Sequence, residues 1–244
     1  MRLAGNGAFQ NNMKKFAVII CISFFGVYSL WAADVQITGK ELGAGINAEY
    51  NRSFNFCGDF SAIGSVTLND HYVAQSGLAL GWLGNTFDIK AFGLFRLTSL
   101  PFRPLKISLL YNYYGLPAGG YNIHTHTILP YISLNWKWAG ISLGAAFRYT
   151  FFFDDLPVFE SMLSFSGYVN FILREKFRMG LKIANFDNFY IRNVGAYYLG
   201  FFGDIRINKN LSVVNELDMY QAGSVALSAS FYGIAYRGGV RYSW

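Results

Sequence analysis

The sequence predicts an all-β protein, a closed up-and-down antiparallel barrel that crosses a membrane with about twelve strands. Hydrophobic residues make up 53% of the chain and charged residues only 14%, well below the roughly 25% of a soluble domain. Aromatic residues reach 19%, and no run beyond the N-terminal region is long and apolar enough for a membrane helix. Apolar and polar residues instead alternate with a period of two, in runs of about ten to thirteen residues, as in half-buried strands.

The first residues, 1–33, have the features of an export signal. A basic pair, an apolar run over residues 16–30 and a small-residue cleavage region follow one another there. Met13 begins a signal of conventional length, so it is the alternative translation start. Residues 34–244 then form the transmembrane barrel, whose charge without the signal is only mildly basic and does not indicate nucleic-acid binding.

Turn residues divide the alternating part of the chain into strands. Between residues 86 and 98, for example, Ile89 and Phe95 lie on one face, whereas Lys90 and Arg96 lie on the other. Asn, Asp, Gly or Pro occupies most of the short connections, where tight turns need their backbone conformations. Ten or eight strands are the alternatives to twelve. The predicted strands cover residues 42–54, 58–68, 71–83, 86–98, 105–115, 126–136, 141–152, 159–172, 177–187, 195–207, 211–220 and 232–244.

An even number of strands places both termini on the periplasmic side of a bacterial outer membrane. The short turns then fall on the same side, and the longest linkers, 116–125 and 221–231, fall on the outside. A lipocalin-type barrel or a β-sandwich would need a charged exterior, and the chain has too few charged residues to coat one. Closing the sheet pairs every backbone group within the bilayer, which an open sheet does not do.

The last strand resembles the C-terminal targeting strand of bacterial outer-membrane proteins. Aromatic and aliphatic residues alternate there with Arg, Gly and Ser, and the chain stops on an aromatic residue. The resemblance implies that the barrel-assembly machinery reads this strand. The size is also similar to small monomeric porins such as the oligogalacturonate channels, and the Tyr- and Phe-rich composition to small spirochaete barrels. The residues implied to form the assembly signal are Tyr236, Val240, Tyr242 and Trp244.

Three short patterns suggest chemistry. The G-x-G-x-x-A run from Gly43 and the G-x-S-x-G run from Gly140 both lie in alternating strands, whereas their known uses require a strand followed by a helix. His124 and His126 lie two residues apart at the outer end of a strand, where they could bind a metal or supply a general base. Interfacial polar residues are the simpler interpretation of this pair, so no catalytic residue, metal site or cofactor is assigned.

The polar faces of the strands carry charges of both signs, which predicts a charged lumen. A barrel of twelve strands lies between those that side chains fill and those that leave an open channel. Basic residues outnumber acidic ones in the predicted set, which favours anionic or zwitterionic solutes. The predicted lumen-lining residues are Asp88, Lys90, Arg96, Lys106, Arg148, Glu160, Arg178, Lys182, Asp204, Arg206, Glu216, Asp218, Arg237 and Arg241.

These observations favour a narrow, passive, porin-like channel for small hydrophilic solutes, and not an enzyme. A barrel with a closed lumen, acting as a structural or surface-interaction (adhesin-like) protein, is the alternative. A lipid-modifying outer-membrane enzyme is the second alternative. The expected partners are outer-membrane lipid, the barrel-assembly machinery and small solutes, with no nucleic acid.

Overall fold

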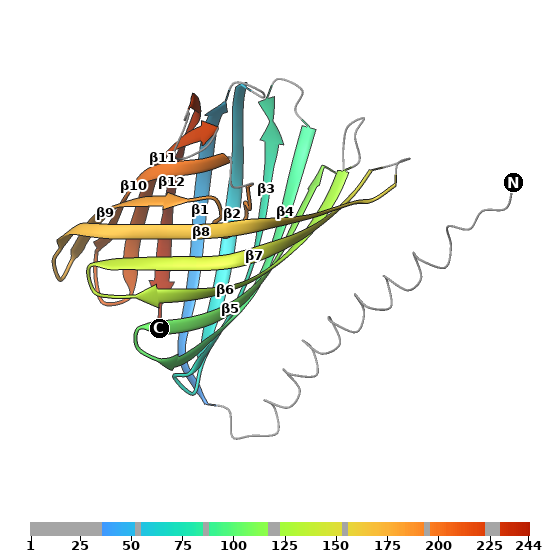
Figure 1. Ribbon diagram of the computed structural model, residues 1–244. Coiled ribbons are helices and arrows are strands. Elements are labelled where there is room, and N and C mark those ends of the chain that lie inside the picture. Colours follow the sequence, from blue (N-terminus) through green and yellow to red (C-terminus); the bar gives the residue numbers. More distant parts are fainter. Residues whose placement is uncertain are drawn as a thin grey trace, which may run out of the picture. The chain divides into compact units, whose positions relative to one another are not determined.

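The computed structural model describes residues 36–51, 55–84, 88–116, 123–152, 156–192, 196–222 and 230–244. The predicted signal peptide, 1–33, lies outside these residues. Figure 1 shows the strands wound around one lumen. They are β1 (Ile37–Asn51), β2 (Asn55–Leu68), β3 (Tyr72–Leu83), β4 (Asp88–Phe102), β5 (Leu105–Leu116), β6 (Ile123–Asn135), β7 (Ala139–Phe151), β8 (Val158–Leu173), β9 (Phe177–Ala184), β10 (Ala196–Arg206), β11 (Leu211–Ala222) and β12 (Ser230–Ser243).

The sheet is closed, which confirms the predicted twelve-stranded, antiparallel, up-and-down barrel. Each strand pairs with the next along the chain, and β1 pairs with β12 from Glu41 opposite Ser243 to Asn51 opposite Gly233. Closure removes the two edge strands that an open sheet would expose. Within the described residues, no helix has the length and hydropathy that a membrane span requires.

Turn chemistry accounts for the short connections at one end of the barrel. Asn69 and Asp70, between β2 and β3, have φ of 50° and 58°, a left-handed conformation that Asn and Asp adopt more readily than most residues. In the turn between β10 and β11, the Asn208 Oδ1 atom accepts hydrogen bonds from the backbone N–H groups of Asn210 and Leu211, at 2.9 and 2.8 Å. These turns set the strand register, and the register decides which side chains enter the lumen.

The two faces of the strands have opposite character, as the alternation predicts. On β4, Ile89 is 49% exposed on the outer surface, whereas the neighbouring Lys90 is only 2% exposed on the inner side. Most large hydrophobic side chains of the described strands point outward, where lipid would cover them. The inner face therefore carries the polar and charged side chains from which a functional site could be built.

One predicted strand continues too far along the chain. The strand predicted over 177–187 stops at Ala184, and the chain then turns into the lumen. The described part of this connection, Asn185–Arg192, is called the inner segment below. The linkers 116–125 and 221–231 were predicted to be the longest, which is wrong: the stretch between the end of β9 and the start of β10 is longer than that between β5 and β6 or between β11 and β12. The alternation continues past Ala184, so it gave no sign that the strand ends there.

Candidate functional site

The inner segment closes on itself into a compact turn. The Asn185 side chain, which is fully buried, donates hydrogen bonds to the carbonyl oxygens of Leu163 and Arg192, at 2.8 and 3.0 Å. The backbone N–H of Arg192 donates to the Asn185 carbonyl at 2.7 Å, which joins the two ends of the segment. Asn185 therefore fixes the point at which the chain leaves the barrel wall.

Asp187 shapes the tip of the inner segment. Its Oδ1 atom accepts hydrogen bonds from the backbone N–H groups of Phe189 and Tyr190, at 2.7 and 2.8 Å. Such an Asx turn replaces a backbone hydrogen bond and suits a short reversal of the chain. The second carboxylate oxygen remains available for the barrel wall.

The apolar side chains of the inner segment pack into the lumen. Phe186, Phe189 and Ile191 are each buried in one cluster with residues of β3 to β7. The Phe186 ring lies 5.2 Å from the ring of Tyr131, and the Tyr190 ring lies 4.8 Å from that of Phe92. This cluster holds the segment by burial of apolar surface, a non-directional attraction.

Tyr190 joins the inner segment to β2 and β4. Its hydroxyl donates a hydrogen bond to the Asp59 carboxylate at 2.9 Å and accepts one from the Lys90 ammonium at 3.0 Å. Lys90 and Asp59 also form an ion pair at 3.0 Å, with side chains only 3% and 5% exposed. Asn47 donates a further hydrogen bond to Asp59 at 2.9 Å. The tyrosine thus completes a buried network that already contains a paired cation and anion.

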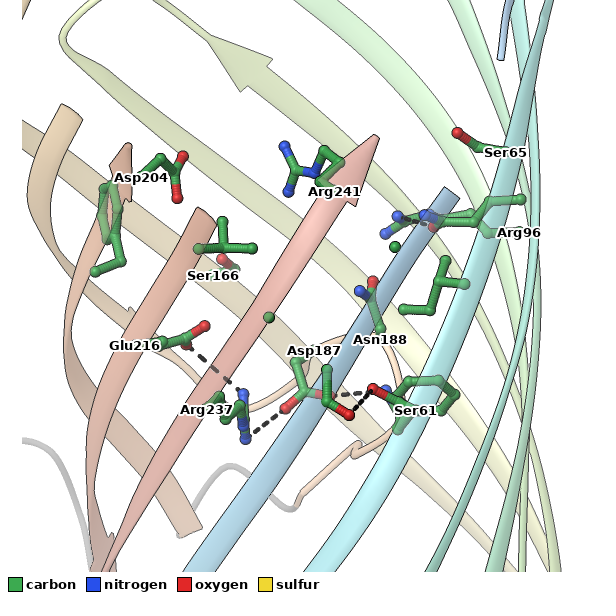
Figure 2. A pocket seen from close by; sticks show the side chains of 18 of the residues that line it. Ser61, Ser65, Arg96, Ser166, Asp187, Asn188, Asp204, Glu216, Arg237 and Arg241 are labelled. Carbon is green, nitrogen blue, oxygen red and sulfur yellow. Dashed lines mark hydrogen bonds and ion pairs between the residues drawn. The ribbon is translucent and has the colours of Figure 1, made fainter. Parts of the chain in front are cut away.

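Arg237 joins the segment to the opposite part of the wall. Its guanidinium lies 2.8 Å from the carboxylate of Asp187, an ion pair drawn in Figure 2. It also lies 3.2 Å from Asp218 and 3.6 Å from Glu216, both on β11. Lys182 pairs with the same two carboxylates, at 3.2 Å from Asp218. Two cations and two wall carboxylates therefore form one network beside the segment.

A glycine makes room for this network. Gly200 on β10 lies in register between Lys182 on β9 and Asp218 on β11. A Cβ atom at Gly200 would collide with the Asp218 carboxylate and the Lys182 side chain. The missing side chain lets the two charged groups meet above the intervening strand.

Two further arginines take part in the contacts between the inner segment and the wall. Arg148 on β7 donates a hydrogen bond to the Ile191 carbonyl and lies 3.5 Å from Glu160, its cross-strand partner on β8. Arg192 lies 3.8 Å from Glu49 on β1, and its guanidinium lies 4.1 Å above the ring of Tyr220. The segment therefore contacts strands on several sides of the lumen.

Cavities lie on both sides of the inner segment. The lower cavity, towards the end with the short turns, has a volume of about 850 Å³, and the upper cavity about 440 Å³. Phe189 and Tyr190 border both cavities. The lower cavity is rich in hydroxyl groups, since Ser133, Ser142 and Ser166 lie in one row across β6 to β8. Polar cavities of this size accommodate water and small solutes.

The structure places most of the predicted lumen residues around these cavities. Asp218 is fully buried within the Lys182–Arg237 network, whereas Arg206 is exposed at the end of β10 and borders neither cavity. The side chain of Asp88 lies outside the described residues. The lower cavity is bordered by Arg96, Lys106, Arg178, Lys182, Asp204, Glu216, Arg237 and Arg241, and the upper one by Lys90, Arg148 and Glu160.

The predicted set omitted several inner carboxylates. Glu41, Glu49 and Asp59 face the lumen, and the alternation of β1 and β2 would have found them. Asp187 and Arg192 were also missed, and because they lie outside any strand, no periodicity marks them. With these residues included, acidic and basic groups nearly balance, so the predicted excess of basic charge in the lumen is largely lost.

Arg96 and Lys106 differ from the other cations at the lower cavity. Arg178 pairs with Asp204, and Arg241 lies 3.2 Å from Glu41. Arg96 instead donates hydrogen bonds to the Gln75 side chain and, at 3.3 Å, to the Tyr131 hydroxyl. Among the described residues, no carboxylate lies within ion-pair distance of Arg96 or Lys106.

The histidine pair lies on the outer face, away from the lumen. The Nδ1 atom of His126 shares a hydrogen bond with the Tyr111 hydroxyl at 2.8 Å, and that of His124 shares one with the Tyr113 hydroxyl at 2.7 Å. The ring of Phe151 lies 5.7 Å from that of His126. In the described part of the chain, no three His, Cys, Asp or Glu side chains are grouped as metal ligands. The geometry is that of an aromatic patch near the rim of the barrel.

The C-terminal residue takes part in barrel closure. The backbone N–H of Trp244 donates to the Lys40 carbonyl at 3.0 Å, and its carbonyl accepts from the Lys40 N–H at 3.1 Å. The predicted signal residues Tyr236, Val240, Tyr242 and Trp244 are all exposed on the outer face, between 44% and 56%. The rings of Tyr242 and Trp244 lie 5.5 Å apart. The role of the four residues in assembly stays a prediction.

Known proteins share this architecture. No protein-family model and no curated protein sequence matches the chain. The NanC porin matches with a TM-score of 0.55 and 9% identity, over 82% of this chain and 98% of its own. The translocator domain of the autotransporter NalP from Neisseria meningitidis matches with a TM-score of 0.54 and 11% identity, over 96% of this chain and 98% of its own. The KdgM porin matches with a TM-score of 0.50 and 12% identity, over 83% of this chain and 99% of its own. At such identities the likeness is one of fold: the chain shares the closed antiparallel β-barrel architecture of two porins and an autotransporter translocator domain.

Proposed function

We propose that the protein is a narrow outer-membrane channel for small hydrophilic solutes, with a preference for anions. The observation that carries this proposal is the lower cavity, a space of about 850 Å³ lined by hydroxyl and charged side chains inside a barrel with an apolar exterior. A purely structural barrel of this size would gain more stability from a lumen filled with apolar side chains. Two of the proteins with the same fold, NanC and KdgM, are named as porins.

The proposed anion preference depends on Arg96 and Lys106. The other lumen charges largely cancel in ion pairs, so they contribute little net potential. The two cations without a carboxylate partner border the lower cavity, where the low-dielectric wall strengthens their field. A dissolved anion entering the cavity would therefore be attracted there, and a cation repelled.

Ion selectivity in planar bilayers tests this proposal. The double variant Arg96→Gln and Lys106→Gln should lower the anion-to-cation permeability ratio to about one or below, since the remaining charges are paired. The matched control, Arg174→Gln and Lys176→Gln, removes the same charge from an exposed turn and should leave the ratio unchanged. An unchanged ratio in the lumen variant would contradict the anion-selective roles.

A barrel with a closed lumen is the second candidate, and the inner segment favours it. The segment buries Phe186, Phe189 and Ile191 within the lumen and connects strands on several sides. A wild-type protein that folds but shows no conductance step at any voltage would support this structural or surface-interaction function.

The proposed location is the bacterial outer membrane, with both termini on the periplasmic face. Outer-membrane lipid would cover the exposed hydrophobic side chains, and the barrel-assembly machinery would insert the protein. The even strand number and the short turns at the end of the barrel where β1 begins and β12 ends support this orientation.

A further inference from the structure

We infer that the inner segment is a displaceable plug, which leaves the lumen as one folded unit and joins the two cavities into a continuous path. Its role as a gate rests on the proposed channel function, whereas the movement itself does not. Three features of the structure support the movement: the contacts that the segment makes within itself, the ion pairs that the wall keeps without it, and the apolar contacts that a single substitution can weaken.

The inner segment makes its own backbone contacts. The N–H of Asp187 donates to the Tyr190 carbonyl at 2.8 Å, and Phe186 and Ile191 form an isolated β-bridge. Arg192 and Asn185 are joined at the base, as described above. These bonds move with the segment. Its carbonyl oxygens that accept from Asn112, Arg148 and Tyr198 of the wall would accept from water instead.

The barrel wall retains its ion pairs when the segment is absent. Arg237 loses Asp187 but keeps Asp218 and Glu216 within 3.6 Å. Lys90 loses the Tyr190 hydroxyl but keeps Asp59 at 3.0 Å.

On β7, Arg148 loses the Ile191 carbonyl but keeps Glu160 at 3.5 Å. Stranding a buried charge is the costly event when such networks open, and these pairs avoid it. Glu49 is the exception, because its ion pair with Arg192 departs with the segment, but at 3.8 Å that pair is the longest of those described.

Apolar and polar contacts both hold the segment in place. Phe186, Phe189 and Ile191 supply the apolar ones, packed against side chains such as Phe92 and Tyr131. The polar ones include a hydrogen bond from the Asn112 side chain to the Phe189 carbonyl at 2.9 Å and one from the Tyr198 hydroxyl to the Phe186 carbonyl. Apolar contacts are non-directional, so removing one side chain weakens the closed state without disturbing the ion pairs of the wall.

Thiol accessibility tests the movement directly. In protein lacking both native thiols (Cys21→Ser, Cys57→Ser) and held in lipid nanodiscs, Asn188→Cys is compared with Ser61→Cys. Both positions border the lower cavity, but one lies on the segment and the other on β2 (Figure 2). The reagent is a maleimide that carries a polyethylene glycol chain too bulky to enter the lumen.

If the segment is a displaceable plug, the thiol at Asn188→Cys should react at least about tenfold faster than that at Ser61→Cys. The reason is that the outward state, populated by about a few per cent of the molecules, exposes only the segment. Adding Phe189→Ala should increase the rate at Asn188→Cys by at least about tenfold and leave Ser61→Cys unchanged, since it weakens the closed state. Equal rates at the two positions, or no response to Phe189→Ala, would overturn the inference.

A deletion variant separates the movement from the channel function. Replacing Phe186–Ile191 by Gly-Gly joins Asn185 to Arg192, whose backbones are already in contact, and removes the plug. Larger conductance steps than in the wild type would support the gate. Conductance equal to that of the wild type would overturn the role of the segment as a gate. No conductance in either protein would refute the proposed channel function, and the labelling result would still decide whether the segment moves.

Discussion

Asp218→Asn is the substitution whose effect the structure predicts most sharply. Asp218 is fully buried and lies 3.2 Å from both Lys182 and Arg237. At an effective dielectric constant of about 20, each contact corresponds to about 5 kcal/mol of Coulomb attraction, much of which offsets the desolvation of the three groups. The amide would leave two neighbouring cations with Glu216 as their main wall partner.

Breaking a buried ion pair in this way costs about 3–5 kcal/mol of folding free energy. Because Glu216 still pairs with both Lys182 and Arg237, the expected loss is at the lower end of this range, about 3 kcal/mol. The measurement is urea-induced unfolding of the protein in phospholipid vesicles, followed by tryptophan fluorescence. Asp204→Asn is the matched control. It removes the same group from an inward position, but its partner Arg178 is 41% exposed, so the expected loss is about 0–1 kcal/mol.

Equal losses for the two variants would refute the reasoning, because burial would then not determine the strength of the pair. A gain in stability for Asp218→Asn would refute it more strongly. It would mean that desolvation of the carboxylate exceeds its attraction to two cations.

Three further predictions follow from the fold. Unboiled protein should migrate differently from boiled protein in gel electrophoresis, because a closed sheet has no edge strand at which unfolding can begin. Identical migration of the two samples would count against closure of the barrel. Deleting Trp244 should block assembly, because the deletion removes the backbone bonds that close the sheet against Lys40. Replacing Trp244 with Asp should block it too, because a charge would replace an aromatic side chain on the apolar outer face. Normal amounts of folded barrel in outer-membrane fractions would contradict this. Changing Lys90, Arg148 and Lys182 together to Glu should prevent stable folding, since each lies within 3.5 Å of a carboxylate; a folded triple variant with reversed ion selectivity would show that these pairs matter little.

The sequence predicted the barrel well because its signal is local. Period-two alternation assigns each residue to one face of its strand without any knowledge of the neighbouring strand. All twelve strands were found in this way, and the turn at Asn69 and Asp70 was recognised from residue type alone. The inward side of Arg96 and Lys106 followed from the same alternation.

The pairing of the lumen charges was not predictable at that level. Lys90 on β4 pairs with Asp59 on β2, two strands away, and Lys182 reaches Asp218 only because Gly200 lies between them. Such contacts depend on strand register and on side-chain reach across the lumen. Counting charges on each face therefore could not show which of the lumen charges are paired.

The sequence by itself determined a closed amphipathic barrel with an apolar exterior and a polar interior, because that outcome requires only the alternation of apolar and polar residues and the turns between strands. Tertiary structure alone decided that residues 185–192 occupy the lumen. Their conformation depends on partners far away in the chain, such as Asp59, which is 131 residues from Tyr190. The segment has no periodicity of its own that would separate it from β9. Its place is set by apolar burial and hydrogen bonds that exist only once the wall has closed around it.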